Sequence, residues 1–167
     1  MKRNYHLCLS SDNEILFRDI EDYNRGFNNF AVALYRTSSV GLVESFMSTH
    51  CHLLVQTEDP DLLMYHFRNS YSKYFNFKYK RNGKLGKDKH FFLEVVGCNH
   101  LLAAISYILR NPLHHGVAPI PFAYHHSTAN SIFRKEMGKY FNEPLLKNRR
   151  SYTKYVGRNA DYADSHK

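Results

Sequence analysis

Two histidines stand one residue apart in the apolar stretch FMSTHCHLLVQ, residues 46–56. In a β-strand successive side chains point to opposite faces, so His50 and His52 would share one face while Cys51 points into the core. Their Cα atoms would lie roughly 7 Å apart, which is close enough for both imidazoles to bind one cation. Two partly exposed histidines on the open face of a sheet are the simpler interpretation. A metal site therefore needs further ligands.

The stretch HLLAAISYILRN, residues 100–111, supplies candidate partners for the histidines. With Ile105 at the centre of the apolar stripe of a helix, Tyr107 and Asn111 lie about 200° and 240° away and one turn from each other. Pro112 predicts that the helix ends near Asn111, where the helix dipole favours a cation and the amide oxygen can ligate it. Tyr107 would then stand one turn from a metal. An ordinary surface tyrosine is the alternative.

Periodicity and turn signals arrange the chain as strand, helix, strand, strand, helix, strand and helix. The expected strands are residues 5–11, 40–48, 50–58 and 90–97, and the expected helices are residues 19–37, 59–80 and 99–111. This β-α-β-β-α-β-α order predicts an α+β, ferredoxin-like fold with a central antiparallel sheet, in which the first and third strands lie in the middle. We expect a catalytic domain at residues 1–128 and a basic, partly mobile C-terminal extension at residues 129–167.

The chain has 167 residues and a formal net charge of +8. This positive excess favours a polyanionic partner, with nucleic acid ahead of a membrane surface. The basic run KYKRNGKLGKDKH, residues 78–90, suits single-stranded DNA because aromatic residues interleave with cations, although an ordinary solvated surface would also explain it. The candidate DNA-binding residues are Lys78, Lys80, Arg81, Lys84, Lys87 and Lys89.

Three cysteines, Cys8, Cys51 and Cys98, lie far apart and form no CxxC motif. Their spacing argues against a disulfide framework or a zinc ribbon and predicts three small core residues in a reducing compartment. The N-terminus is too charged for a signal peptide, and no apolar run approaches the roughly 18 residues of a membrane span. We therefore expect a cytoplasmic protein with no membrane partner.

The remaining histidines have weaker claims to a metal. The adjacent pairs at residues 114–115 and 125–126 are expected in solvated loops, where neighbouring side chains diverge. His6 lies on the first strand, which should neighbour the third strand. It is either a partnered sheet histidine or one that approaches the metal face.

The motif HCH preceded by FMST, followed about fifty residues later by YILRNPLHHGV, resembles the HUH single-tyrosine transposases. The resemblance is to the REP-associated tyrosine transposase branch of the insertion-sequence family. Members of this branch carry His-hydrophobe-His on a central strand and a helix with one nucleophilic tyrosine, followed by Asn-Pro. The stretches YHLCLSS near the start and AYHHST at residues 123–128 also resemble this branch, so the resemblance covers roughly residues 5–128.

The resemblance implies cleavage and rejoining of single-stranded or hairpin DNA with Mg²⁺ or Mn²⁺ as cofactor. Tyr107 would be the catalytic nucleophile that forms a 5′-phosphotyrosine, and His50, His52 and Asn111 would hold the metal. Related transposases include monomers and homodimers, so both states are open. Two alternatives also stay open: a replication-initiator or relaxase-type HUH nickase, and a non-catalytic nucleic-acid-binding ferredoxin-like domain.

Overall fold

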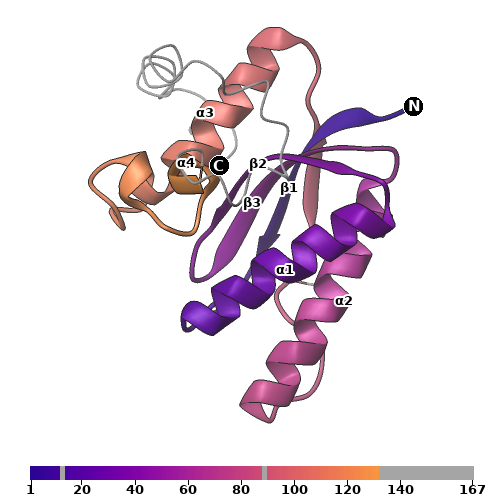
Figure 1. Ribbon diagram of the computed structural model, residues 1–167, viewed down its shortest axis with the longest axis vertical. Helices are drawn as coiled ribbons and strands as arrows, with labels where there is room; N and C mark the ends of the chain where they lie inside the picture. Colours follow the sequence, from indigo (N-terminus) through magenta and orange to yellow (C-terminus); the bar gives the residue numbers. More distant parts are fainter. Residues whose placement is uncertain (12–13, 88–89, 132–167) are drawn as a thin grey trace.

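Figure 1 shows a computed structural model of the chain, which describes residues 1–11, 14–87 and 90–131. The strands are β1 (Arg3–Ser10), β2 (Val40–Phe46), β3 (His50–Thr57) and β4 (Phe91–Glu94), and the helices are α1 (Ile20–Arg36), α2 (Pro60–Tyr79), α3 (Cys98–His114), the 3₁₀ helix η1 (Pro121–Ala123) and α4 (Thr128–Ser131). The β-α-β-β-α-β-α order of an α+β, ferredoxin-like fold is confirmed. Within the described ranges, no helix has the length and apolarity needed to cross a membrane.

The four strands form one antiparallel sheet in the order β2-β3-β1-β4. The first and third strands lie in the centre, as predicted, and their register places Cys8 opposite His52 and Ser10 opposite His50. A tight hairpin joins β2 to β3, and in it the N–H of Met47 donates to the carbonyl of His50 over 2.7 Å. The histidine pair therefore lies at the beginning of a central strand whose backbone is held on both sides.

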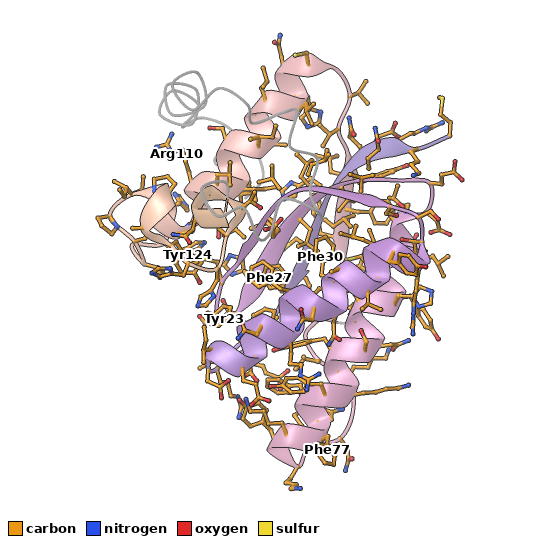
Figure 2. The ribbon with its side chains drawn as sticks, viewed as in Figure 1. Tyr23, Phe27, Phe30, Phe77, Arg110 and Tyr124 are labelled. Atoms are coloured by element: carbon orange, nitrogen blue, oxygen red, sulfur yellow. The ribbon has the colours of Figure 1, made fainter. Side chains whose placement is uncertain are left out.

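Helices cover both faces of the sheet (Figure 1). Residues from α1 and α2 form one core with the β3 side chains Cys51, Leu53 and Val55. Aromatic rings fill much of this core, and the centroid of Phe27 lies 4.4 Å from that of Phe46 (Figure 2). Leu54 joins the second core, which packs beneath α3. The alternation predicted for β3 is confirmed, and it directs the two histidines toward α3.

Helix α1 departs in part from the apolar stripe predicted by the three- and four-residue spacing of Ile20, Tyr23, Phe27, Phe30, Ala31 and Leu34. Ile20, which the stripe placed inward, is 64% exposed, while Asp22 is fully buried. Asp22 can be buried because it accepts hydrogen bonds from the Lys78 ammonium and the Tyr79 hydroxyl. Gly26 faces the core, where a Cβ atom would lie 2.7 Å from the ring of Phe17. Local periodicity cannot show such pairings, because their partners lie far along the chain.

Helix α2 has the predicted ends. The side chain of Asp59 caps its N-terminus by accepting from the N–H of Leu62, and Pro60 occupies the first turn. Lys80 ends the helix in a left-handed conformation with φ 52°. The sequence pattern predicts that five residues point inward: Leu63, Phe67, Tyr71, Tyr74 and Phe75. All five are buried except Tyr74, which is half-buried.

The start of α3 differs from the prediction. β4 has only four residues, which pair with Tyr5–Cys8 of β1. Gly97, with φ 80°, then precedes the helix in the N-cap position that was predicted for Asn99. Cys98 is the first helical residue and is exposed, so the prediction of a third core cysteine is wrong.

The end of α3 also differs from the prediction, because the helix continues through Pro112 to His114. Pro112 lies in the last turn, so its missing N–H costs a single helical hydrogen bond near a terminus. The turn is closed instead by the N–H of His115, which donates to the carbonyl of Asn111 over 3.1 Å. Asn111 is therefore a helical residue in the last turn.

The segment after α3 pairs with the outer edge of β2. The N–H of Phe46 donates to the carbonyl of His126, and the N–H of Glu44 donates to the Thr128 hydroxyl. Ala129 of α4 is fully buried in the core beneath α3. The folded unit thus continues past the predicted boundary at residue 128. The rest of the predicted mobile extension, residues 132–167, lies outside the described residues.

Candidate active site

β3 places His50 and His52 on the sheet face that α3 covers. Their ring centroids are 5.1 Å apart, and His52 is buried while His50 is half-buried. The His50 ring bridges two polar groups: Nδ1 lies 3.1 Å from Oγ1 of Thr49, and Nε2 lies 3.0 Å from Oδ1 of Asn111. The strand and the helix that the sequence assigned to one site therefore meet through side chains.

His6 of β1 is the hydrogen-bond partner of His52. Its Nε2 lies 3.0 Å from Nδ1 of His52, and only 2% of the residue is exposed. His6 sits opposite Leu54 in the register, so it projects from the same face as the histidine pair. Because this bond engages Nδ1 of His52, Nε2 is the ring nitrogen of His52 that a metal would use. His6 is thus both a partnered sheet histidine and a neighbour of the metal face.

Tyr107 of α3 packs against these imidazoles. Its ring centroid lies 5.1 Å from that of His52 and 5.7 Å from that of His6. The residue is half-buried and packs on the core beneath α3, so it is less peripheral than the helical angles predicted. Burial raises the pKa of Tyr107, and Cys8 adds to the increase. The phenol is therefore neutral at pH 7 and needs a nearby cation to ionise readily.

Asn111 is almost completely buried, with 1% exposed. The helical angles predicted that Asn111 lies off the apolar stripe. In the structure its side chain is buried against the sheet, next to His50. Its amide oxygen approaches His50, whereas its amide nitrogen has no hydrogen-bond partner among the described residues. Buried polar atoms usually have a hydrogen-bond partner, so the Asn111 amide nitrogen is available to donate to a polar ligand.

His115 is a neighbour of His50 that sequence reasoning missed. Tyr107, Asn111 and His115 recur at four-residue intervals and so share one face of α3. The ring centroid of His115 lies 5.0 Å from that of His50, although its side chain is exposed. The prediction of a solvated loop followed from ending the helix before Pro112. Continuing the four-residue interval through the proline was the signal that could have found this histidine.

The two central imidazoles are held in their neutral form. Burial lowers the pKa of His50, partly offset by the hydrogen bond with Asn111. Burial lowers the pKa of His52 well below its ordinary value, and the nearby rings of His6, His50 and His115 act in the same direction. Neutral imidazole is the form that ligates a metal, so protons compete little at pH 7.

The donor atoms of His50, His52 and Asn111 fit a divalent metal. The 3.0 Å between Nε2 of His50 and Oδ1 of Asn111 matches two adjacent ligands of an octahedral ion with bonds of about 2.1 Å. Across the described ranges, no three His, Cys, Asp or Glu side chains form a cluster that could hold a metal. An ion here would depend on the Asn111 amide and on water for the oxygen ligands that Mg²⁺ or Mn²⁺ needs beside two imidazoles.

The expectation of solvated loop histidines is confirmed for His125 and is wrong for His126, which is half-buried, and for His114, which is helical. His114 and His125 are exposed, as expected for solvated residues, although His114 belongs to the last turn of α3. His126 stacks on Tyr23, with centroids 3.7 Å apart. Within the described part of the chain, none of these three rings contacts His52.

The six candidate DNA-binding residues have different surroundings. Lys78 lies within 2.9 Å of a carboxylate oxygen of both Asp19 and Asp22, so its charge is compensated inside the fold. Arg81 pairs with Glu14 over 2.6 Å, and Lys80 lies over the ring of Phe77. Lys84 and Lys87 are exposed, and Lys89 lies outside the described residues. Their role in binding DNA stays a prediction, and the position of Lys78 speaks against it for that residue.

Comparisons with known proteins support the fold. No family model and no curated protein matches the sequence. The structure is similar to that of a REP-associated tyrosine transposase bound to a REP hairpin, with a TM-score of 0.69 and 9% identity over 86% of this chain and 85% of that chain. A Deinococcus radiodurans R1 protein provisionally described as a transposase matches with a TM-score of 0.47 and 14% identity, over 66% of this chain and 91% of that chain. The first comparison shows that this chain has the fold of that transposase structure.

Proposed function

We propose that this protein is a metal-dependent single-strand DNA transposase that nicks and rejoins DNA through a 5′-phosphotyrosine intermediate. The observation that supports the proposal best is the gathering of His50, His52, Asn111 and Tyr107 on one face of the sheet. Two neutral imidazoles and an amide oxygen stand beside one half-buried phenol. The similarity in fold to a structure of a tyrosine transposase agrees with this chemistry.

His50, His52 and Asn111 would hold a Mg²⁺ or Mn²⁺ ion, which as a Lewis acid would polarise the scissile phosphate. His6 would keep the His52 ring in one tautomer and orientation through the bond between Nε2 and Nδ1. Thr49 would do the same for His50 through its bond to Nδ1. These contacts preorganise the two ligands before DNA arrives.

Tyr107 would supply the nucleophile. Its phenolic oxygen would attack phosphorus, forming an O–P bond while the bond from phosphorus to the 3′ oxygen breaks. The phenol loses one proton and the departing oxygen gains one, so the products are a 5′-phosphotyrosine and a free 3′-OH. Attack by another 3′-OH would reverse these steps, and no nucleotide cofactor is needed because the phosphoester bond is conserved.

Single-stranded or hairpin DNA would be the partner. The similar transposase structure is bound to a REP hairpin, and the net charge of +8 suits a polyanion. We place the contacts on Lys80, Lys84, Lys87 and Lys89. We leave out Lys78 and Arg81 because both pair with carboxylates inside the fold. We further propose action in the cytoplasm as a monomer or a homodimer.

Two other functions predict different behaviour. A relaxase-type nickase would use the same groups, but the YxxxNP spacing favours a transposase. A non-catalytic domain would bind DNA without forming an adduct. The donors around His50 and the neighbouring phenol of Tyr107 favour an active enzyme.

One gel experiment tests the proposed function. Hairpin DNA with single-stranded flanks is labelled at either its 5′ or its 3′ end and incubated with protein and Mn²⁺. The 3′ label should migrate with the protein under denaturing conditions, the 5′ label should remain on a shortened strand, and EDTA should abolish both products. Intact DNA with every divalent metal, together with undiminished DNA binding, would instead support the non-catalytic domain.

A further inference from the structure

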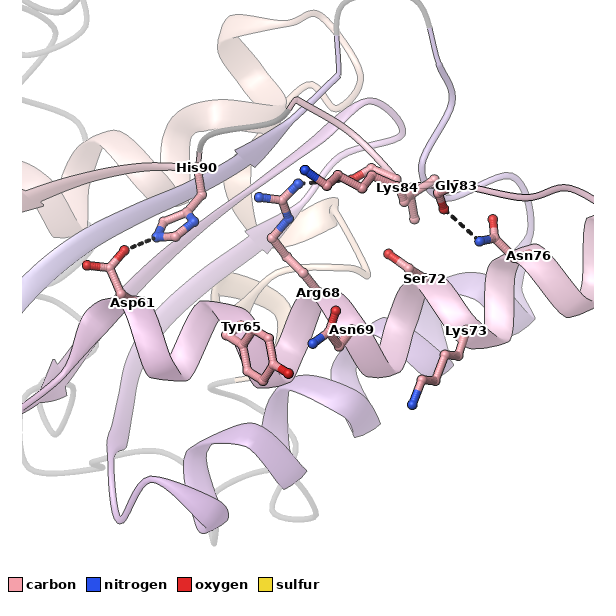
Figure 3. Close-up of a pocket in the computed structure, with 11 residues that line it drawn as sticks. Asp61, Tyr65, Arg68, Asn69, Ser72, Lys73, Asn76, Gly83, Lys84 and His90 are labelled. Atoms are coloured by element: carbon pink, nitrogen blue, oxygen red, sulfur yellow. Dashed lines mark hydrogen bonds and ion pairs between the residues drawn. The ribbon is translucent and has the colours of Figure 1, made fainter.

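A groove lies between the outer side of α2 and residues 81–90, which lead into β4 (Figure 3). Its volume is about 570 Å³. Helix α2 packs on the sheet face opposite α3, so this groove, which we call the α2 groove, is separate from the site around Tyr107. This volume falls within the range of about 300–1,000 Å³ that is typical of ligand-binding clefts.

Three side-chain contacts hold the walls of the α2 groove together. The amide of Asn76 donates to the carbonyl of Gly83 over 2.7 Å (Figure 3). The Arg68 guanidinium donates to the carbonyl of Lys87. At one end, Nε2 of His90 lies 3.0 Å from a carboxylate oxygen of Asp61. The loop is thereby fixed against the helix at Gly83, Lys87 and His90, so this part of the groove is preformed.

Cations dominate the charge of the α2 groove. Among the described lining residues, Arg68, Lys73 and Lys84 stand against one carboxylate, that of Asp61, which is next to His90. Lys73 and Lys84 are exposed. A ligand with negative charges spread along its length fits this lining.

The α2 groove also offers an aromatic surface and amides. Tyr65 is 61% exposed, and Asn69 and Lys73 follow it at four-residue intervals on the same side of α2. From Tyr65 to Asn76 the helix axis rises about 16 Å. A nucleic-acid strand in a duplex rises about 3.4 Å per nucleotide, so this distance corresponds to roughly five of them.

We propose that the α2 groove binds a nucleic-acid strand that flanks the reacting phosphate, with Tyr65 stacking on a base or sugar and Arg68, Lys73 and Lys84 contacting phosphates. The inference rests on the proposed function and adds a second contact region to it. Residues 84–87 belong to the basic run that was predicted to bind DNA. The α2 residues of the groove were not predicted to bind it, because exposed side chains that alternate with buried ones along a helix have the pattern of an ordinary surface. Helix α2 and the basic loop would bind the strand together.

Nucleic acid fits this lining better than an acidic peptide. An exposed aromatic ring beside cations and amide groups is the combination that binds stacked bases and phosphates together. Carboxylates of a peptide would use the cations but leave the ring of Tyr65 without a role. Removing that ring therefore distinguishes the two ligands.

The test compares two double variants of the full chain. Tyr65→Ala/Lys73→Ala removes an aromatic ring and a cation from the α2 groove. Tyr35→Ala/Lys2→Ala removes the same side chains from exposed positions elsewhere, since Tyr35 is 86% exposed. Fluorescence anisotropy measures the Kd for a labelled hairpin with single-stranded flanks, at several salt concentrations and without metal, so that no cleavage occurs.

The groove variant should bind about tenfold or more weakly than the parent, with a salt slope reduced by about 0.7–0.9. The control variant should stay within about twofold of the parent Kd. An equal loss of DNA affinity in the two variants would contradict DNA binding in the α2 groove. The transposase proposal would still hold if the parent forms an adduct. If the parent binds no DNA, both proposals are wrong. If polyglutamate competes for the groove as well as unlabelled DNA does, the ligand of the groove is an acidic peptide and not nucleic acid.

Discussion

The side-chain oxygen of Asn111 lies 3.0 Å from Nε2 of His50, across 61 residues of sequence. This contact joins the last turn of α3 to the first residue of β3. The two atoms are oriented toward each other as two ligands of one ion would be, and each is a good ligand for a hard or borderline metal. The packing of α3 on β3 therefore positions two of the proposed metal ligands next to each other.

Replacing Asn111 tests whether its oxygen is a metal ligand. Asn111→Ala should weaken Mn²⁺ binding roughly tenfold or more, because one donor is lost. Asn111→Asp keeps an oxygen at the same position and adds charge, so it should bind Mn²⁺ at least as tightly as the parent. Isothermal titration with Mn²⁺, after thermal melts establish that each variant is folded, gives the comparison. Identical affinity in the parent and the alanine variant would remove Asn111 from the site.

His6 should act on the metal through His52. His6→Leu removes the hydrogen bond to Nδ1 of His52 and should lower Mn²⁺ affinity by about 10- to 100-fold. His6→Gln restores a polar partner and should recover part of the loss. Nitrogen-15 NMR of the His52 ring should also report a mixture of tautomers in His6→Leu. A single unchanged tautomer with parent affinity would mean that His6 only fills space.

Glu44 gives the chain a dependence of stability on pH. Its carboxyl oxygens are buried and make no hydrogen bond within the described ranges. Burial raises the pKa of Glu44 to about 8, and the Thr128 hydroxyl opposes the increase only partly. Since the folded-state pKa exceeds the unfolded value, stability is fully present below about pH 4.5 and declines as pH rises toward 8.

Glu44→Gln should abolish that decline. Between pH 5 and pH 9 the parent should lose a free energy of unfolding on the order of a few kcal/mol that the glutamine variant retains. Urea unfolding of both proteins at several pH values measures the difference. Parallel stability profiles for the two proteins would show that the Glu44 carboxyl is not held neutral by the fold.

Sequence periodicity accounts for the parts of the fold that local pattern controls. The alternation along β3 predicted which face carries His50 and His52. Asp59 was expected to cap α2, and the helix was expected to end near Lys80. Strand order followed from the sequence of elements. The alternation and the helix cap depend on neighbouring residues, whereas strand order follows from the connection rules of the β-α-β-β-α-β unit.

The sequence predictions that were wrong concern residues whose contacts lie in distant segments of the chain. Asp22 is buried because Lys78 and Tyr79 donate to it, which no pattern in α1 reveals. Pro112 was expected to end α3, but its place in the last turn made the lost hydrogen bond inexpensive. That extra turn is what brings His115 to His50. The role of His6 depended on strand register, which the sequence left open.

The identity of the nucleophile is the central claim. Tyr107→Phe removes one oxygen and keeps the ring, so the fold and Mn²⁺ binding should survive. Adduct formation should then fall to background, which exceeds the 10²–10⁴ loss expected for a general acid or base. Tyr35→Phe, at an exposed position, is the control and should form adduct at the parent rate.

The most direct measurement is peptide mass mapping of the adduct formed by the parent protein with hairpin DNA and Mn²⁺. We predict a single modified peptide that contains Tyr107, with DNA attached through its 5′ end, and no adduct from Tyr107→Phe. A 5′-linked adduct on another residue, or one formed by Tyr107→Phe at near the parent rate, would contradict this account.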